Sequence, residues 1–184
     1  YELMFKIVTN FLEILAVSRH LSGLKENYTL IKPSEIENNW FLKRKKAELH
    51  KPKLLYLGRY KKEKGVFSLT NIFNSINFDF ELNIVGLKKK VILANDKVKL
   101  FNEVNSTKKI INFYDKCNIF VLPSYTEGAP KVIFESLARY RPIIVFEEIK
   151  HVKENFKGIF VCKRQVKDFT NKVRYIIKNY KSIT

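Results

Sequence analysis

Two glutamates separated by seven residues, Glu127 and Glu135, are the side chains of this sequence best placed to do chemistry. An apolar run at residues 119–122 stops at a proline, a polar turn then holds Glu127, and an amphipathic segment begins at Pro130. The pattern predicts a strand, a loop and a helix, with Glu127 in the loop and Glu135 about two turns into the helix. Because a helix N-terminus offers free N–H groups and a positive dipole end, this loop suits a phosphate or a diphosphate.

A second group of polar residues follows the apolar run at residues 54–57. Gly58 allows close backbone approach, Arg59 can donate two hydrogen bonds to phosphate oxygens, and Lys64 adds a positive charge where a helical pattern begins. Taken alone, a glycine and an arginine after a strand are more often a turn with a surface cation. The segment has neither a dinucleotide-binding glycine pattern nor a P-loop, which argues against an NAD enzyme and a P-loop NTPase.

Alternating apolar patterns predict the elements that would position these residues. The predicted strands cover residues 53–57, 81–85, 97–101, 118–122, 142–146 and 158–161. The predicted helices, besides the one that begins at Pro130, are residues 66–76, a run capped by Ser106 that extends to Lys116, and residues 166–180. This alternation predicts a doubly wound, Rossmann-like α/β fold whose mostly parallel sheet is covered by helices on both faces. In such a sheet, ligands bind beyond the carboxyl ends of the strands, where both polar groups would meet.

The charge of the chain is strongly positive. Its 184 residues carry 35 Lys and Arg against 18 Asp and Glu, a formal net charge of +17. Local clusters occur at residues 43–46, 61–62 and 88–90. Such an excess fits a generic basic surface or a surface that meets anionic lipid headgroups, and both interpretations stay open. No nucleic-acid-binding motif accompanies the charge, so we expect no nucleic-acid partner.

Breaks in the pattern predict how the chain is organised. Residues 1–30 resemble the end of a preceding domain, residues 31–52 a linker lying against a domain rather than an element of its core, and residues 53–184 one domain. Cys117 and Cys162 fit reduced, buried thiols better than a disulfide framework. No apolar run is long enough to span a membrane, and no leader opens the sequence, so we expect a cytoplasmic protein. The chain begins with Tyr1 rather than Met, which is compatible with a piece of a longer protein.

With these residues in view, the chain resembles the C-terminal half of the retaining glycosyltransferases of the GT-B group 1 family (glycosyltransferase family 4). The resemblance covers residues 53–165 with specific motifs and residues 10–52 more faintly. The matching motifs are Leu57-Gly58-Arg59, Glu63-Lys64-Gly65-Val66, Leu82-Asn83-Ile84-Val85-Gly86, Phe120-Val121-Leu122-Pro123-Ser124, Glu127-Gly128, Pro130, Val132, Glu135-Ser136-Leu137-Ala138 and Pro142.

The resemblance implies a role for each site residue. Arg59 and Lys64 would bind the diphosphate of a nucleotide-sugar donor, Glu127 would lie beside the sugar ring, and Glu135 would hold the ribose hydroxyls. The expected donor-binding set is Gly58, Gly128, Ala129, Pro130, Lys131, Val132 and Glu135, with Glu127, Arg59 and Lys64 as catalytic residues. No metal and no further cofactor are expected. From the residues alone, Glu135 could instead pair with Lys131 or Arg139, each four positions away on the helix.

The function implied is a glycosyltransferase donor domain that transfers a sugar, with retention, to a saccharide or lipid-linked acceptor in polysaccharide biosynthesis. The acceptor site would belong to an N-terminal domain or subunit that this chain almost wholly lacks, and the protein would be cytoplasmic or peripheral at the inner membrane face. The alternative is a non-catalytic nucleotide-sugar-binding or basic membrane-docking module.

The chain departs from the family pattern at three places. Tyr140 and Arg141 stand where a glycine usually precedes the proline, Asn102 replaces a glycine at the end of the third strand, and residues 32–35 replace a Pro-Asn-Gly. The first two leave the preferred base of the nucleotide open.

Overall fold

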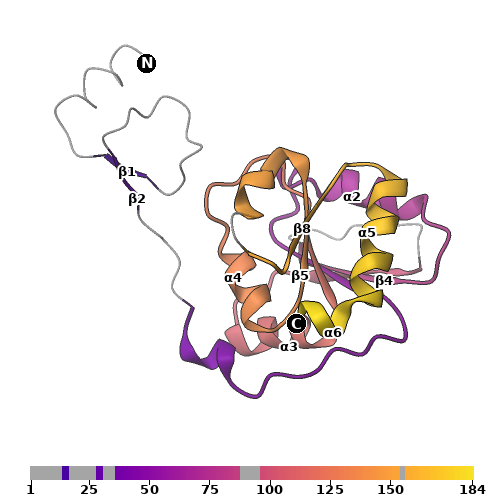
Figure 1. The fold of residues 1–184 in the computed structure, drawn as a ribbon, viewed down its shortest axis with the longest axis horizontal. Helices are drawn as coiled ribbons and strands as arrows, with labels where there is room; N and C mark the ends of the chain where they lie inside the picture. The colour runs from indigo at the N-terminus through magenta and orange to yellow at the C-terminus, as the bar shows by residue number, and fades with distance from the viewer. Residues whose placement is uncertain (1–13, 17–27, 31–35, 88–95, 154–155) are drawn as a thin grey trace, which may run out of the picture.

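The protein is described from a computed structural model, which places residues 14–16, 28–30, 36–87, 96–153 and 156–184. Its main feature is an all-parallel sheet of six strands in the order β5-β4-β3-β6-β7-β8 (Figure 1). The strands are β3 (Lys53–Leu57), β4 (Glu81–Leu87), β5 (Val98–Asn102), β6 (Ile119–Leu122), β7 (Ile143–Phe146) and β8 (Ile159–Cys162). Numbered from β3, this order is 3-2-1-4-5-6, the order of a doubly wound dinucleotide-binding fold.

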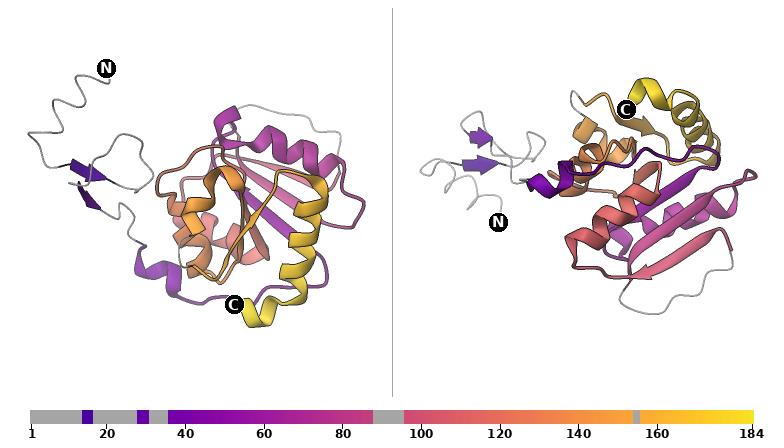
Figure 2. Two further views of the ribbon diagram at one scale, coloured as in Figure 1. Left: turned by 45° about the horizontal axis from the view of Figure 1, so that its top comes forward. Right: turned by 90° about the horizontal axis from the view of Figure 1, so that it is seen from below.

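Helices cover both faces of this sheet, as the sequence predicted (Figures 1 and 2). One face carries α2 and α5, and the other carries η1, α3, α4 and η3. The helical elements are η1 (Asn38–Phe41), η2 (Lys62–Lys64), α2 (Val66–Asn74), α3 (Thr107–Lys116), α4 (Lys131–Ala138), η3 (Glu147–Lys153), α5 (Val166–Lys178) and α6 (Tyr180–Ile183). Every predicted strand and helix of this domain is present, with ends that differ by a few residues at most.

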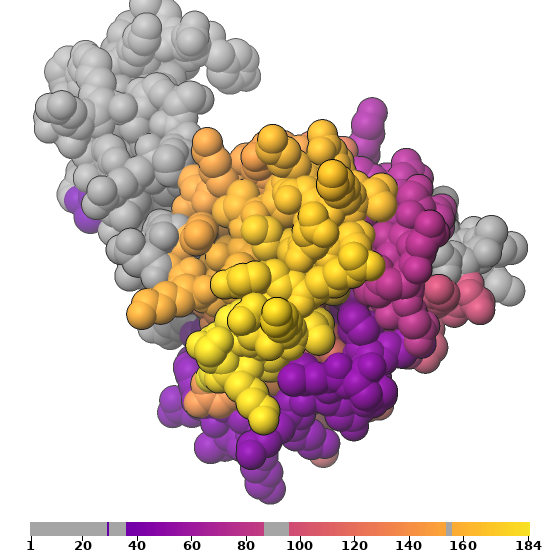
Figure 3. All heavy atoms as spheres, turned by 45° about the vertical axis from the view of Figure 1, so that its right-hand side comes forward, coloured from indigo at the N-terminus to yellow at the C-terminus, as the bar shows by residue number. Residues whose placement is uncertain are grey.

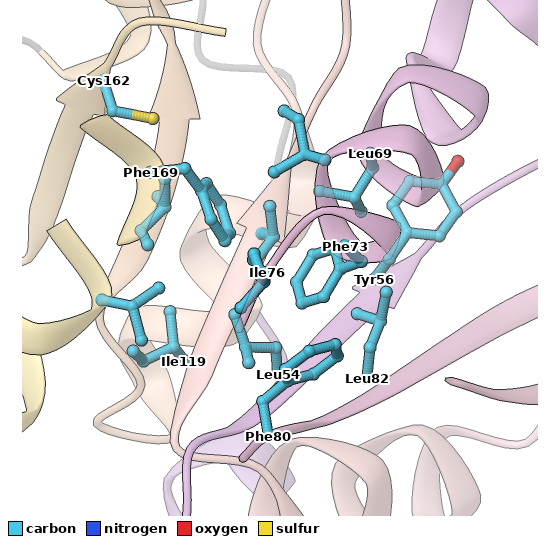
Figure 4. Packing of buried hydrophobic residues seen from close by; sticks show 14 of the residues in the cluster. Leu54, Tyr56, Leu69, Phe73, Ile76, Phe80, Leu82, Ile119, Cys162 and Phe169 are labelled. Carbon is cyan, nitrogen blue, oxygen red and sulfur yellow. The ribbon is translucent and has the colours of Figure 1, made fainter. Parts of the chain in front are cut away.

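Two apolar cores follow from the alternation of side chains along the strands. Leu54 and Tyr56 of β3 point into the core beneath α2 and α5, where Phe73 meets Phe169 with ring centroids 5.4 Å apart (Figure 4). Leu55, between them, points into the opposite core. Because β3 is buried on both faces, its sequence is a continuous apolar run rather than an alternating one.

The segment before β3 corrects one sequence interpretation. Residues 36–52 do lie against the domain, but Trp40 of η1 is only 2% exposed and belongs to the second core, with its ring edge-on to Tyr114 at 5.6 Å. The expectation that this segment contributes nothing to a core is therefore wrong. The polar and basic residues around Trp40 hid a single anchoring side chain.

Residues 40–52, from Trp40 to the start of β3, form what we call the basal strap. It runs along the amino ends of the strands, between α3 and the C-terminal helices, and ends where β3 begins (Figure 2, right). Asn118, directly before β6, fixes it: its side-chain nitrogen donates to the carbonyl oxygens of Glu48 and Lys51, and its Oδ1 accepts from the N–H of Lys53.

Some sequence predictions fall on residues that the structure does not describe. Of the segment 1–30, only β1 (Ile14–Ala16) and β2 (Tyr28–Leu30) are described, and they pair in parallel. The lysine cluster at residues 88–90 lies outside the described residues. None of the helices formed by the described residues combines the length and hydrophobicity that crossing a bilayer requires.

Candidate functional site

The strand order reverses between β3 and β6, which are neighbours in the sheet although far apart in the chain. From β3 the chain moves outward to β4 and β5, and from β6 it moves the other way to β7 and β8. The loops that leave the carboxyl ends of these two strands are residues 58–65 and 123–130. Doubly wound sheets bind their ligands at such a place, which we call the β3–β6 switch point. Of the polar residues singled out in the sequence, Arg59, Lys64 and Glu127 lie in these two loops, and Glu135 lies on the helix that follows the second.

Two glycines let the backbone segments at this edge approach closely. Gly65 has φ +68°, and a Cβ there would lie 1.8 Å from the carbonyl oxygen of Pro123 in the other loop. Gly86, at φ +120° near the end of β4, lies against the carbonyl of Gly58, where a Cβ would come within 2.0 Å. Only glycine fits both the left-handed backbone and the missing space. The two loops are thus in direct main-chain contact, reinforced by the N–H of Tyr125 donating to the carbonyl of Glu63.

Lys64 and Glu127, which come from different loops, meet at the centre of this edge. Lys64 Nζ donates to Glu127 Oε1 at 2.8 Å, and the hydroxyl of Ser124 donates to the same oxygen at 2.6 Å. Their side chains are 24% and 11% exposed, so the ion pair is sheltered but reachable from solvent. Lys64 holds the carboxylate of Glu127 in a fixed position, and its ammonium group can also bind an anionic ligand.

Two residues that sequence reasoning missed hold the loop 123–130 in place. Arg164 donates from Nη1 to the carbonyl of Pro123 at 2.9 Å and from Nε to Glu148 at 2.8 Å, and its guanidinium lies 4.2 Å from the ring centre of Tyr125. His151 Nε2 lies 2.9 Å from the carbonyl oxygen of Glu127. Arg164 follows β8 at the same sheet edge, a position that could have indicated it, whereas His151 lies in a short irregular helix without any motif.

Glu135 lies one layer deeper, on α4. It is 8% exposed, and its Oε2 accepts a hydrogen bond from the hydroxyl of Tyr114 on α3 at 3.2 Å. Burial raises the pKa of the Glu135 carboxyl above its usual value, against the lowering effects of this hydrogen bond and of the positive charge of Lys131. When ionised, the Glu135 carboxylate can accept further hydrogen bonds from neutral donors such as sugar hydroxyls.

The alternative pairing of Glu135 with Arg139 is wrong. Arg139 turns away from Glu135 and forms a two-pronged ion pair with Asp115 of α3, at 2.9 Å through both Nε and Nη2. Lys131, in contrast, does act on Glu135 electrostatically.

The remaining predicted site residues lie around this centre. Arg59 is exposed in the loop after β3, and its carbonyl accepts from the hydroxyl of Tyr56. Gly58 directly follows β3, and its N–H donates to the carbonyl of Val85. The segment from Gly128 through Ala129 and Pro130 leads into the first turn of α4, Lys131 and Val132, with Pro130 as the residue that precedes the helix.

The structure thus joins Lys64 directly to Glu127, whereas Arg59 lies in the loop after β3 and Glu135 lies on α4. Chemically, the edge combines an arginine, a lysine and a helix N-terminus, which suit an anion, with one carboxylate in the loop and one behind the helix start. This combination suits a ligand with both phosphate and hydroxyl groups. Two grooves of about 610 and 590 Å³ lie elsewhere, beside the basal strap at the opposite edge of the sheet.

Comparison with known proteins agrees with this geometry. Residues 38–183 match the family model described as glycosyl transferases group 1. An uncharacterized glycosyltransferase of Haemophilus influenzae is 28% identical over 139 residues, which cover 69% of this chain and 39% of that protein. A capsular polysaccharide biosynthesis glycosyltransferase of Staphylococcus aureus is 27% identical over 137 residues, 67% of this chain and 36% of that protein. The chain therefore spans about two fifths of the length of these curated relatives.

Solved structures show the same fold. The Anabaena protein HepE, whose structure is a complex with UDP and glucose, superposes with a TM-score of 0.68 at 12% identity, over 98% of this chain and 59% of that one. The resemblance to the C-terminal half of a GT-B glycosyltransferase, made on the motifs at residues 53–165, is confirmed. Since the matching family model covers most of its residues, this chain belongs to the glycosyl transferases group 1 family.

Proposed function

We propose that this chain binds a nucleoside-diphosphate sugar at the β3–β6 switch point and supplies the donor half of a retaining glycosyltransferase. The observation that carries the proposal is the contact between Lys64 and Glu127, 2.8 Å apart across the two loops at the point where the strand order reverses. A cation for the diphosphate and a carboxylate for the sugar side of the scissile bond are thereby brought to one place.

The donor would lie across the loops with its diphosphate near Arg59, Lys64 and the N-terminus of α4. These groups offset the charge that develops on the leaving diphosphate as the bond to the sugar breaks, so no metal is required in this scheme. Because Lys64 donates to Glu127 in the structure, an arriving diphosphate would share or take this cation. The carboxylate of Glu127 would then be available to the sugar ring, where positive charge develops in the transition state.

Glu135 would hold the ribose. Its Oε2 is engaged by Tyr114, and we assign Oε1 to the ribose hydroxyls. The segment from Gly128 to Val132 would surround the sugar and the phosphates.

The complete enzyme would transfer the sugar to a saccharide or lipid-linked acceptor in polysaccharide biosynthesis, at the cytoplasmic side of a membrane. Support for the pathway comes from the Staphylococcus aureus relative, whose name assigns it to capsular polysaccharide biosynthesis. The acceptor site would be provided by a further domain or subunit outside these residues.

Chemical-shift mapping with UDP, GDP and ADP tests donor binding. We expect perturbed amide signals at Gly58, Arg59, Glu127 and Gly128 with at least one of the three nucleotides, because the site features meet there. No perturbation with any of them would remove the proposal. If a nucleotide binds but the protein completed with its acceptor domain transfers no sugar, the non-catalytic binding module is the better description.

A further inference from the structure

The basal strap has an unusual backbone environment, because buried donors satisfy its carbonyl groups from inside the domain. Arg139, only 1% exposed, donates from Nη1 to the carbonyl oxygens of Trp40 and Leu42 at 2.9 and 2.8 Å and from Nη2 to that of Lys43 at 3.2 Å. Arg141, equally buried, donates to the carbonyl of Lys45 at 2.8 Å. The strap is therefore fixed from beneath along its first half.

With the carbonyls of Leu42, Lys43 and Lys45 directed inward, several side chains of the strap face solvent. Phe41 is 46% exposed and Leu42 is 63% exposed, which is high for large apolar side chains. Lys43, Lys45 and Lys46 follow them directly and are all exposed. An aromatic and an aliphatic residue thus stand next to a row of cations on one rigid segment, which is visible at the surface beside the C-terminal helices (Figure 3).

The lysines of this row project as free cations from the surface. Among the described residues, the ion pairs include none made by Lys43, Lys45 or Lys46. Arg44, within the same row, lies 4.3 Å above the ring of Tyr140, which is itself 46% exposed. Beside the row, a groove of about 590 Å³ extends to Lys181 near the end of the described chain. The surface is wide enough to meet several anionic groups at once.

We propose that the basal strap is a docking surface for an anionic lipid bilayer. Phe41 and Leu42 would enter the headgroup region, and Lys43, Lys45, Lys46 and Lys181 would contact lipid phosphates. Exposed apolar side chains beside the cations favour a bilayer over duplex DNA, whose bases are stacked inside and whose outer surface carries the phosphates. The strap lies at the amino ends of the strands, so a docked domain directs its β3–β6 switch point away from the lipid, toward soluble ligands.

This inference is independent of the proposed donor site, because it uses none of the residues placed there. Its test is sedimentation of the full chain with phosphatidylcholine vesicles that contain or lack about 30% phosphatidylglycerol. The anionic lipid gives the vesicles a negative surface potential like that of a cytoplasmic leaflet. We expect binding only to the anionic vesicles, and a weaker interaction as salt rises.

The discriminating variant is the triple charge reversal Lys43→Glu, Lys45→Glu and Lys46→Glu. It should weaken vesicle binding by about 100-fold or more, since each cation near an anionic surface contributes about 1 kcal/mol and 1.4 kcal/mol is a tenfold change. The matched control reverses Lys150, Lys153 and Lys167, which are also exposed but lie on η3 and α5. This control changes the net charge equally and should retain most of the binding.

A second variant, Phe41→Ser with Leu42→Ser, tests the apolar part and should lower vesicle binding about tenfold, mainly at high salt where the charges are screened. Three results would overturn the proposal: no binding of the unaltered chain to anionic vesicles, equal losses in the strap and control triples, or an affinity for duplex DNA that matches the lipid affinity and survives the serine substitutions. Inorganic phosphate should weaken vesicle binding no more than a chloride salt of equal ionic strength, because a single phosphate cannot replace a surface.

Discussion

The two edges of the sheet hold arginine and lysine in opposite ways. At the carboxyl edge, Lys64 and Arg164 are partly exposed and each is paired with one carboxylate, Glu127 and Glu148 respectively. At the amino edge, Arg139 and Arg141 are buried and are surrounded by main-chain carbonyls. Lys64, which is partly exposed and bonded to one carboxylate, can exchange that partner for a ligand, whereas an arginine that satisfies several carbonyls cannot be released without unfolding its surroundings. In its buried cations, the amino edge therefore fixes the chain, whereas the carboxyl edge keeps a cation that a small ligand can reach.

The largest expected effect is therefore at the amino edge. Arg139→Gln removes the partner of Asp115, whose side chain is 7% exposed, and leaves the carbonyls of the strap without their donor. Breaking a buried ion pair on one side typically costs 3–5 kcal/mol, so we expect the free energy of unfolding to fall by about that amount. Urea denaturation followed by circular dichroism measures it.

The matched control at the carboxyl edge is Arg164→Gln, since Arg164 also donates to a carbonyl and a carboxylate but is 15% exposed, with Glu148 34% exposed. It should cost clearly less, because solvent replaces part of what is lost. If both variants lose the same free energy of unfolding, the arginines of the two edges contribute equally to stability and the comparison fails.

Gly65→Ala is expected to have the next largest effect. The added Cβ would lie 1.8 Å from the carbonyl oxygen of Pro123, and the residue would have to keep a φ of +68°. Left-handed backbone costs roughly 1–2 kcal/mol for a residue with a side chain, and overpacking adds typically 1–3 kcal/mol. We predict a loss of about 2–4 kcal/mol in thermal or urea unfolding. A Gly158→Ala variant, where the nearest atom is the movable end of Leu137, should be milder.

The elements of the fold were predictable because their signals are local. The apolar runs of β3, β6 and β7 are buried on both faces, and a continuous run bounded by polar residues is what such a strand looks like in sequence. The loop positions of Glu127 and Lys64 followed from the strands before them, and their joint location from the rule that parallel strands place their carboxyl ends at one edge. The roles assigned to them came from the family motifs.

The contacts that fix the amino edge could not be predicted in this way. Arg139 reaches the carbonyl of Trp40, 99 residues earlier in the chain, and no periodicity encodes such a distance. Trp40 itself lies in a polar, basic segment. Its burial depends on packing against Tyr114, which is distant in sequence, rather than on a local pattern. Arg141, which stands where the family usually has a glycine, is likewise explained only by the carbonyls of Tyr114, Lys45 and Asp115 that surround it.

At the carboxyl edge, the two glutamates should separate in a binding experiment. Glu135→Ala is expected to weaken binding of a bare nucleoside diphosphate by about 1–3 kcal/mol, the cost of losing a charge-assisted hydrogen bond. Glu127→Ala should leave this affinity unchanged or raise it, because it frees Lys64 from its carboxylate partner, while lowering turnover of the sugar donor in the completed enzyme. Isothermal titration beside steady-state rates measures both. The opposite pattern would reverse the roles of loop and helix.

The pH dependence of binding gives a smaller effect with a definite sign. Burial raises the pKa of Glu135, so its carboxylate is lost at a higher pH than that of an ordinary glutamate as the solution is acidified. If the ribose hydroxyls require the ionised form, affinity should fall about tenfold per pH unit below the raised pKa. The same shift makes the free energy of unfolding decrease as pH rises from the ordinary to the raised pKa. Nucleotide titrations at a series of pH values, with the unaltered chain and with Glu135→Gln, check it. If the fall in affinity at low pH, the acid limb of the curve, is identical in both, the effect belongs to the nucleotide's own phosphates.

The last prediction tests whether Tyr114 connects the two edges. Its hydroxyl donates to Glu135 Oε2, while its carbonyl accepts from buried Arg141 and its ring packs against Trp40, so one residue joins the fixed edge to the carboxylate assigned to the ribose. Tyr114→Phe removes only the hydroxyl. Since that hydrogen bond lowers the pKa of Glu135, its loss should move the acid limb of nucleotide binding to higher pH and weaken binding at neutral pH by about 0.5–1.5 kcal/mol.

The double variant Tyr114→Phe with Glu135→Gln is the control for this substitution. With no carboxylate to titrate, removal of the hydroxyl should no longer move the acid limb. A merely structural role of the tyrosine would lower stability and affinity in both backgrounds alike without moving the limb in either. An unmoved limb in the single variant, measured where the unaltered chain binds normally, would therefore show that the hydroxyl does not prepare Glu135. The amino edge would then support the fold without reaching the site.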